Sequence, residues 1–285
     1  MLSYLPLISA IVSGLCFTLL GILLKRNTSA GASPFILPSW LALLFPVWAG
    51  AFIVSHATGQ LHFNLTPGAL LWPVLWAACT VTTTTLLVWL LQSLSLTEVA
   101  GYKKALLTLL ASGADIFLFQ TVFPYATVAA LGCILVGSLI LGQVRNSVPN
   151  LKQALALIGW CVIITAQVSA YKYGQNFQPD VLAFTILAQG CSTFLYTLLW
   201  LLPSVKNTPF KLGPALPLLA VAFTGVAIEG FAYKALPLAV VILITMSGAA
   251  LFAVYDLATR DLPLTKRTAL ALAAIALGFM LLFVK

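Results

Sequence analysis

Ionisable side chains inside long apolar segments are the residues of this sequence best suited to chemistry. Glu229 is the only acid in the segment of residues 212–236, and small residues beside it leave room for a ligand. A carboxyl group in an apolar interior can take up and release a proton. Glu229 is therefore predicted to bind a charged ligand or to carry a proton. The alternative is a structural ion pair with Lys234 or Lys104.

A stripe of small and polar residues follows the segment of residues 98–119. Residues three or four apart share one helix face, and a polar face on an apolar helix must meet protein or water. Lys104 and Thr108 are predicted to line a cavity, where the ammonium group would bind an anionic ligand group; alternatively Lys104 reaches the helix end or pairs with an acid such as Glu98. Lys103 points about 100° away and is predicted to reach the membrane boundary. The stripe comprises Gly101, Lys104, Thr108, Ser112 and Asp115.

Two aspartates occupy matching places in two similar stretches of the chain. Asp115 and Asp256 are 141 residues apart (256 minus 115), and each lies near the predicted end of an apolar helix. They are predicted to pair with cations at helix ends, such as Arg260. The alternative is that making and breaking these pairs opens and closes a cavity.

Three further segments place polar and aromatic side chains on one helix face. Such faces line a cavity or form hydrogen bonds between helices, and the sequence leaves both alternatives open. The predicted cavity residues on these faces are Trp89, Gln92, Gln167, Gln189 and Tyr196.

No motif for a metal ion, a nucleotide or another cofactor occurs in the sequence. G-x-x-x-x-G-K-[ST] and H-E-x-x-H are absent, and His56 and His62 have no third ligand near them. The five cysteines stand singly in apolar segments, which is typical of core residues. No cofactor and no catalytic residue is therefore predicted, and any transport is not powered by ATP within this chain.

The composition indicates a membrane protein. Hydrophobic residues make up 61% of the chain and charged residues 7%, and the mean hydropathy is +1.08. A chain of this length with so few polar groups cannot cover a water-soluble surface. Its net charge of +8 comes from residues at predicted helix ends, where cations contact lipid headgroups, so nucleic acid is not an expected partner.

Ten apolar segments are long enough to cross a bilayer, which takes roughly 17 to 25 residues. They form two sets of five, and residues 1–146 and 147–285 are predicted to be two five-helix repeats. The predicted fold is therefore an all-α integral membrane protein. The segments are residues 4–24, 34–54, 67–92, 98–119, 124–142, 151–171, 179–202, 212–236, 239–258 and 266–284.

The distribution of Lys and Arg predicts the orientation. Links after the first, fifth, seventh and ninth segments are rich in basic residues, while the alternate links are poor in them. The positive-inside rule then places both termini outside the cytoplasm. The expected location is the bacterial inner (plasma) membrane.

A short break recurs before the fourth and the ninth segments, with Ser93, Leu94 and Val99 in the first half and Ala235, Leu236 and Val241 in the second. With the ten segments, this break resembles the EamA-like branch of the drug/metabolite transporter (DMT) superfamily. The resemblance implies two inverted repeats and a cavity lined by segments 1, 3, 4, 6, 8 and 9 that opens to one side at a time. It also implies cytoplasmic termini, opposite to the charge distribution.

These observations favour a secondary transporter that moves a small polar metabolite, zwitterionic or anionic, by alternating access. Protons are the predicted coupling ion, with Glu229 as their site, and the partners are this small molecule and membrane lipid. The alternatives are a flippase for a lipid-linked substrate, drug efflux, an intramembrane enzyme and a scaffold subunit. An enzyme would need converging catalytic groups, whereas the six acids here are scattered.

Overall fold

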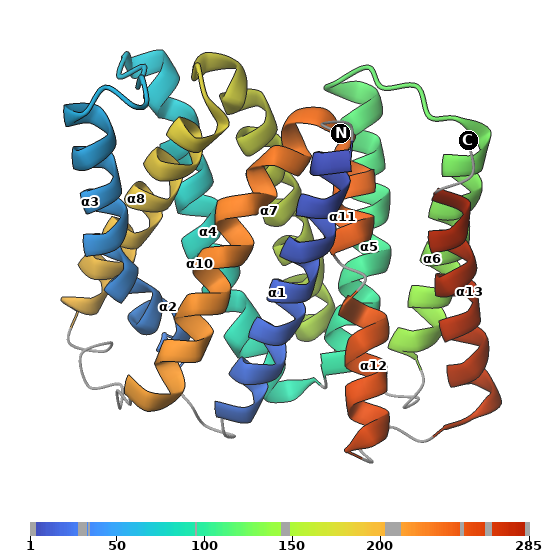
Figure 1. Cartoon of the computed structure of the whole chain (residues 1–285). Coiled ribbons are helices and arrows are strands. Elements are labelled where there is room, and N and C mark those ends of the chain that lie inside the picture. The colour runs from blue at the N-terminus through green and yellow to red at the C-terminus, as the bar shows by residue number, and fades with distance from the viewer. Residues whose placement is uncertain are drawn as a thin grey trace.

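The computed structural model describes residues 4–27, 33, 35–94, 96–143, 149–202, 212–245, 248–259 and 264–282. These residues form helices joined by short links, with no strand among them (Figure 1). The helices are α1 (Leu5–Asn27), α2 (Ile36–Leu41), η2 (Ala42–Leu44), α3 (Phe45–Ala57), α4 (Pro67–Ser93), α5 (Leu96–Phe117), α6 (Tyr125–Gly142), α7 (Leu151–Gly174), η3 (Gln175–Phe177), α8 (Val181–Trp200), α10 (Leu212–Ala235), α11 (Leu238–Thr245), α12 (Gly248–Ala258) and α13 (Lys266–Leu282).

Local sequence signals set several helix ends. Pro67 opens α4, where its missing N–H would have had no helical partner. Asn150 caps α7 through a reciprocal pair with Gln153, in which each side chain accepts from the other residue's backbone N–H. Pro237 separates α10 from α11, because proline disfavours helical geometry in the residue before it.

Eight runs of helix in the described part of the chain are long and apolar enough to cross a membrane. The protein is therefore an all-α, multi-pass membrane protein. Helices also occupy the other two predicted segments: α5, which carries four charged residues, and α13, which has 17 residues. The eight runs are Leu5–Arg26, Ile36–Ala57, Pro67–Leu91, Tyr125–Gly142, Leu151–Phe177, Val181–Trp200, Ala215–Ala235 and Leu238–Ala258.

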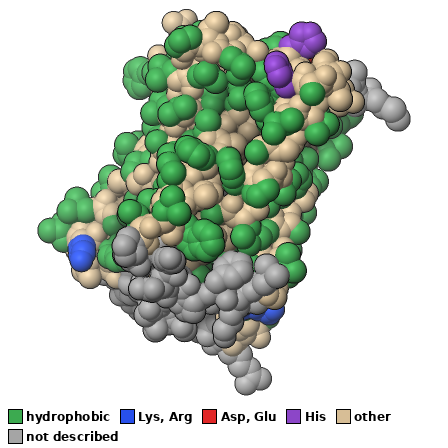
Figure 2. All heavy atoms as spheres, turned by 90° about the vertical axis from the view of Figure 1, so that its left-hand side faces the viewer, with side chains coloured by type: hydrophobic (Ala, Val, Ile, Leu, Met, Phe, Trp, Pro, Cys, Tyr) green, Lys and Arg blue, Asp and Glu red, His purple; other side chains and the backbone are tan. Residues whose placement is uncertain are grey.

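The outer surface agrees with a bilayer as the surrounding solvent. Figure 2 shows hydrophobic side chains over most of the face formed by the left-hand side of Figure 1, with histidines at one end and Lys or Arg at the other. Exposed apolar residues such as Ile53, Val54 and Leu198 contribute to this kind of surface. An apolar band between polar ends is what hydrocarbon requires.

Helix packing divides the molecule into a large group of helices and a flanking pair. Helix α1 packs along α10, and α4 packs against α7 and α8. The pair α6 and α13 packs together beside α5 (Figure 1). The backbones of this pair approach so closely at Gly137 that an added methyl group would lie 2.8 Å from the Ala271 carbonyl oxygen. Small residues allow such close packing in membranes.

Candidate functional site

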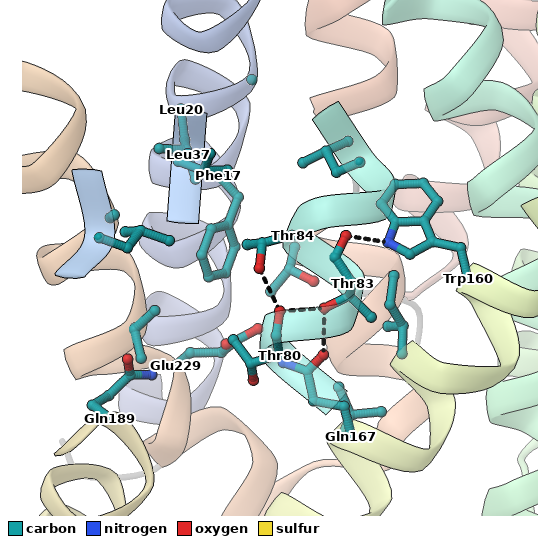
Figure 3. A pocket seen from close by; sticks show the side chains of 18 of the residues that line it. Phe17, Leu20, Leu37, Thr80, Thr83, Thr84, Trp160, Gln167, Gln189 and Glu229 are labelled. Atoms are coloured by element: carbon teal, nitrogen blue, oxygen red, sulfur yellow. Dashed lines mark hydrogen bonds between the residues drawn. The ribbon is translucent and has the colours of Figure 1, made fainter. Parts of the chain in front are cut away.

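A pocket of about 270 Å³ lies within the larger group of helices. Helices α1, α4, α5, α7, α8, α10 and α11 contribute to its wall, together with residues of α2, η2, α3 and α12. Much of the wall is aromatic or aliphatic, with Phe17, Trp48, Trp76 and Phe223 among the large side chains. Figure 3 shows Thr80, Thr83, Thr84, Gln167, Gln189 and Glu229 around the same space. An apolar pocket with a few converging polar groups is typical of a small-molecule site.

Two opposite charges face this pocket from different helices. Lys103 of α5 and Glu229 of α10 both line it, and they are close enough to interact electrostatically. The distance between the Lys103 nitrogen and the Glu229 carboxylate oxygens exceeds 4.0 Å, so the two side chains do not form a salt bridge. The Lys103 ammonium instead lies 4.5 Å from the centroid of the Trp160 ring, and Tyr233 donates a hydrogen bond to Glu229 Oε1 at 3.0 Å. Both charges thus remain available to a ligand between them.

Lys103 lines the pocket and Lys104 does not, whereas the sequence predicted Lys104 in the cavity and Lys103 at the membrane boundary. Lys104 does not line the pocket; its side chain is fully buried, and its ammonium lies 4.8 Å from the centroid of the Phe279 ring in α13. No described residue forms a hydrogen bond with this ammonium. The reason is the orientation of α5, which turns the Lys104 side toward α13 and the Lys103 side, about 100° away, toward the pocket.

Thr108, predicted beside Lys104, follows it away from the pocket. Its side chain is buried and its hydroxyl has no hydrogen-bond partner among the described residues. The alternative reading of Glu229 as a structural ion pair also finds no support, since neither Lys104 nor Lys234 lies within salt-bridge distance of it in the described part of the chain.

Three predicted residues from α7 and α8 do come together at the pocket. Gln167 accepts a hydrogen bond from the Thr83 hydroxyl at 3.2 Å, and Tyr196 shares one with Thr84 at 2.7 Å. Gln189 is buried, and its side-chain N–H group has no partner among the described residues. An unpartnered buried donor in a pocket wall is costly unless a ligand or water accepts from it.

Helix α4 contributes a different face from the predicted one. Trp89 does not line the pocket and instead has the Lys152 ammonium 5.7 Å from its ring centroid. The side chain of Gln92 lies outside the described residues. The face that does line the pocket repeats at helical spacing, and this periodicity is a signal that could have identified it. Its members are Trp76, Thr80, Thr83, Thr84, Leu87 and Leu91.

The two matching aspartates bind helix amino termini. Asp115, near the end of α5, accepts from the backbone N–H groups of Leu238 and Ala239 at 2.9 and 2.7 Å, at the start of α11. Asp256, near the end of α12, accepts from the backbone N–H and the hydroxyl of Thr97, at the start of α5. Carboxylates are stabilised there by unpaired N–H groups and the helix dipole. The predicted partner Arg260 lies outside the described residues.

Two lysines make a second pair of matching contacts at the same two ends. Lys25, in the last turn of α1, donates to the Leu91 carbonyl near the end of α4, at 2.9 Å. Lys172, in the last turn of α7, donates to the Leu236 carbonyl after α10, at 3.0 Å. Lys172 also lies 3.7 Å from Asp115. At each end of the molecule, therefore, an aspartate binds the start of a neighbouring helix, and a lysine donates to a carbonyl at or just after the end of another helix.

Comparisons with known proteins bear on the fold alone. No protein-family model matches the chain, and no curated protein matches its sequence. A solved crystal structure of a protein 18% identical in sequence resembles this one with a TM-score of 0.68, over 96% of this chain and 96% of that chain. The fold thus has a solved counterpart of nearly the same extent. Among the described residues, no group of three His, Cys, Asp or Glu side chains could hold a metal ion.

Proposed function

We propose that this protein is a secondary transporter for a small zwitterionic metabolite. The observation that carries the proposal is that Lys103 and Glu229 face one pocket and that neither forms a salt bridge with a described residue. Charges buried in a membrane protein are costly and are found on substrate and ion pathways. A ligand with one ammonium and one carboxylate would complete both pairs at once.

The pocket wall suggests how such a ligand would lie. Its ammonium would approach Glu229, and its carboxylate would approach Lys103 beside Trp160. The free N–H of Gln189 would donate to an acceptor on the ligand, while Trp48, Trp76 and Phe223 would cover an apolar substituent. A volume of about 270 Å³ favours a metabolite over a lipid-linked molecule or a large drug.

The architecture proposed for this function is two inverted five-helix repeats, as in the EamA-like branch of the DMT superfamily. Asp115 and Asp256 support it, because Asp115 near the end of α5 binds the start of α11, and Asp256 near the end of α12 binds the start of α5, as antiparallel helices would. The matching contacts of Lys25 and Lys172 support it as well. In inverted-repeat transporters, the site lies between the repeats and opens to alternate sides.

The same contacts are candidates for the gates. The Asp115 contacts hold one end of the helix group and the Asp256 contacts hold the other, on opposite ends of α5 (Figure 1). Alternating access requires that one end opens while the other stays closed. In our proposal each aspartate releases its helix start when its own end opens.

Proton coupling is proposed to run through Glu229, the acid that faces the pocket. A carboxylate that binds the substrate ammonium cannot hold a proton at the same site, so substrate and proton would compete for it. Such competition links the two fluxes in opposite directions, provided that the empty, unprotonated carrier reorients slowly.

Binding of charge-deleted ligands tests the proposed function. Thermal unfolding of the purified protein should be followed with L-leucine, its methyl ester and 4-methylpentanoate, as first members of panels of zwitterions, cations and anions. A ligand at 100 times its Kd stabilises the folded state by about 2.7 kcal/mol. We expect stabilisation by a zwitterion and not by its single-charge analogues. Equal stabilisation by the ester, or response to anions only, would rule out the zwitterion proposal.

Flux measurements then test transport itself. Proteoliposomes loaded with the stabilising zwitterion should exchange it for labelled zwitterion outside, whereas protein-free liposomes should not. Binding without exchange would indicate a receptor or a scaffold subunit instead of a transporter.

A further inference from the structure

We propose that Tyr233 and Tyr171 carry protons between Glu229 and the α7–α8 link, by a route separate from the pocket opening. The inference rests on the proposed role of Glu229 and adds to it the path by which the proton arrives. It is drawn from a row of buried polar groups that begins at Tyr233 in the pocket wall and continues behind it.

The first contact of the route is the hydrogen bond from Tyr233 to Glu229 Oε1, at 3.0 Å. Tyr233 is itself buried, and its ring lies 5.6 Å from the ring of Tyr171, which belongs to α7 and does not line the pocket. The hydroxyl of Tyr171 shares a hydrogen bond with Thr185 of α8. Two buried phenol groups therefore lead away from the carboxyl group.

Gly230 brings the second phenol next to the acid. A methyl group at Gly230 would lie 2.5 Å from the Tyr171 hydroxyl, so only glycine lets this hydroxyl rest on the backbone beside Glu229. Gln175 donates to the Gly230 carbonyl at 3.0 Å, and its own side-chain oxygen is buried without a partner among the described residues. Gln175 starts the short helix η3, whose next residues, Asn176 and Phe177, are exposed. The row of polar groups thus reaches from the pocket to one end of the molecule.

The proposed transfer leaves the proton count balanced. Tyr233 gives its hydroxyl proton to the Glu229 carboxylate and takes up the proton of Tyr171, directly or through one water molecule. Tyr171 is reloaded from solvent at the Gln175 end. Release of the proton from Glu229 runs through the same steps in reverse.

Few titratable groups in the described part of the chain lie near Glu229. On the pocket wall these are Lys103 of α5, Tyr196 of α8 and Tyr233 of α10 itself. Cys16 of α1 lies against Gly225, one turn away. Tyr171 of α7 lies behind Tyr233, and among these described groups Tyr233 and Tyr171 are the two that lead from Glu229 toward η3.

A pH-jump experiment tests the route without a substrate. Trp48, Trp76 and Trp160 line the pocket, so tryptophan fluorescence after a rapid pH change should contain a phase that reports Glu229. That phase is identified by its absence in Glu229→Gln. Tyr171→Phe should slow it by about tenfold or more, since a positioned proton-transfer group contributes at least that much. Tyr233→Phe should slow it as well.

Tyr255→Phe is the control. Tyr255 of α12 does not line the pocket, and its hydroxyl accepts a hydrogen bond from Arg26, so it lies outside both the pocket and the route. Its loss should leave the rate unchanged. An unchanged rate in Tyr171→Phe, equal slowing in Tyr255→Phe, or a wild type without a Glu229-dependent phase would each overturn the proposal. The fluorescence phase needs no ligand, so failure of the zwitterion to bind or exchange counts against the proposed function alone.

Discussion

Asp115 and Asp256 hold the two ends of α5 against α11 and α12. Asp115, near the end of α5, accepts from the first residues of α11, and Asp256, near the end of α12, accepts from Thr97 in the first turn of α5. Both carboxyl groups are buried. The two contacts tie α5 to helices that are far from it in the sequence, one at each end of α5.

Removing either aspartate should destabilise the protein by a similar amount. Asp115→Ala leaves two buried N–H groups without an acceptor, and Asp256→Ala leaves the N–H and the hydroxyl of Thr97 without one; each loss costs about 2 kcal/mol. Thermal unfolding in detergent measures this loss.

If the contacts are gates, the two variants should also change access to the pocket in opposite directions. A cysteine at Val226, in the pocket wall, in a background without native cysteines, should react faster with an impermeant thiol reagent in one variant and slower in the other. Equal rates would leave the aspartates a structural role only.

The adjacent lysines provide an internal comparison. Lys103→Met removes the charge that faces the pocket, so the carboxylate of the ligand should lose its partner, and the affinity for a zwitterion should fall by roughly tenfold or more. The L-leucine ester should then bind as well as L-leucine. Lys104→Met should leave binding unchanged and raise stability, because an apolar side chain then replaces a buried ammonium that has no hydrogen-bond partner among the described residues. Thermal shifts with both ligands check this pair. If Lys104→Met abolished binding, the ligand carboxylate would have to be assigned to Lys104 instead of Lys103.

Glu229→Gln should separate proton coupling from substrate exchange. Glutamine keeps the size and much of the hydrogen bonding of glutamate but cannot titrate. A pH gradient should no longer drive accumulation of labelled zwitterion into proteoliposomes, while exchange at equal pH should persist at reduced affinity. Accumulation with unchanged pH dependence would assign coupling to another group.

The orientation can be measured at the link between α12 and α13. Leu264 is exposed there, and the basic residues of this link predict a cytoplasmic location. With native cysteines removed, Leu264→Cys should resist an impermeant thiol reagent in intact cells and react after permeabilisation. Rapid labelling in intact cells would instead place both termini in the cytoplasm, as the DMT resemblance implies.

The sequence by itself determined that the protein lies in a membrane and where its helices are. Hydropathy and segment length are local properties, so the apolar ranges were recognisable. Described helices occur in each of them, and eight runs of helix in the described part of the chain meet the length and hydropathy of a membrane span. Glu229 could be singled out in the same way, because a lone acid in an apolar segment is costly wherever the helix is placed. The predicted polar faces of α7 and α8 also line the pocket, through Gln167, Gln189 and Tyr196.

Only the tertiary structure decided which side chains share the pocket and what the aspartates bind. Lys103 and Lys104 differ by one position, and their placement depends on how α5 is rotated against α6 and α13, which no local pattern specifies. The rotation of α4 is likewise not specified by a local pattern. The sequence predicted that the face with Trp89 lines the pocket, whereas in the structure the face with Thr80, Thr83 and Thr84 does so. Asp115 and Asp256 both accept from backbone N–H groups more than 100 residues away. Every residue except proline offers such a group, so residue identity cannot reveal the partner, and only packing brings the two together.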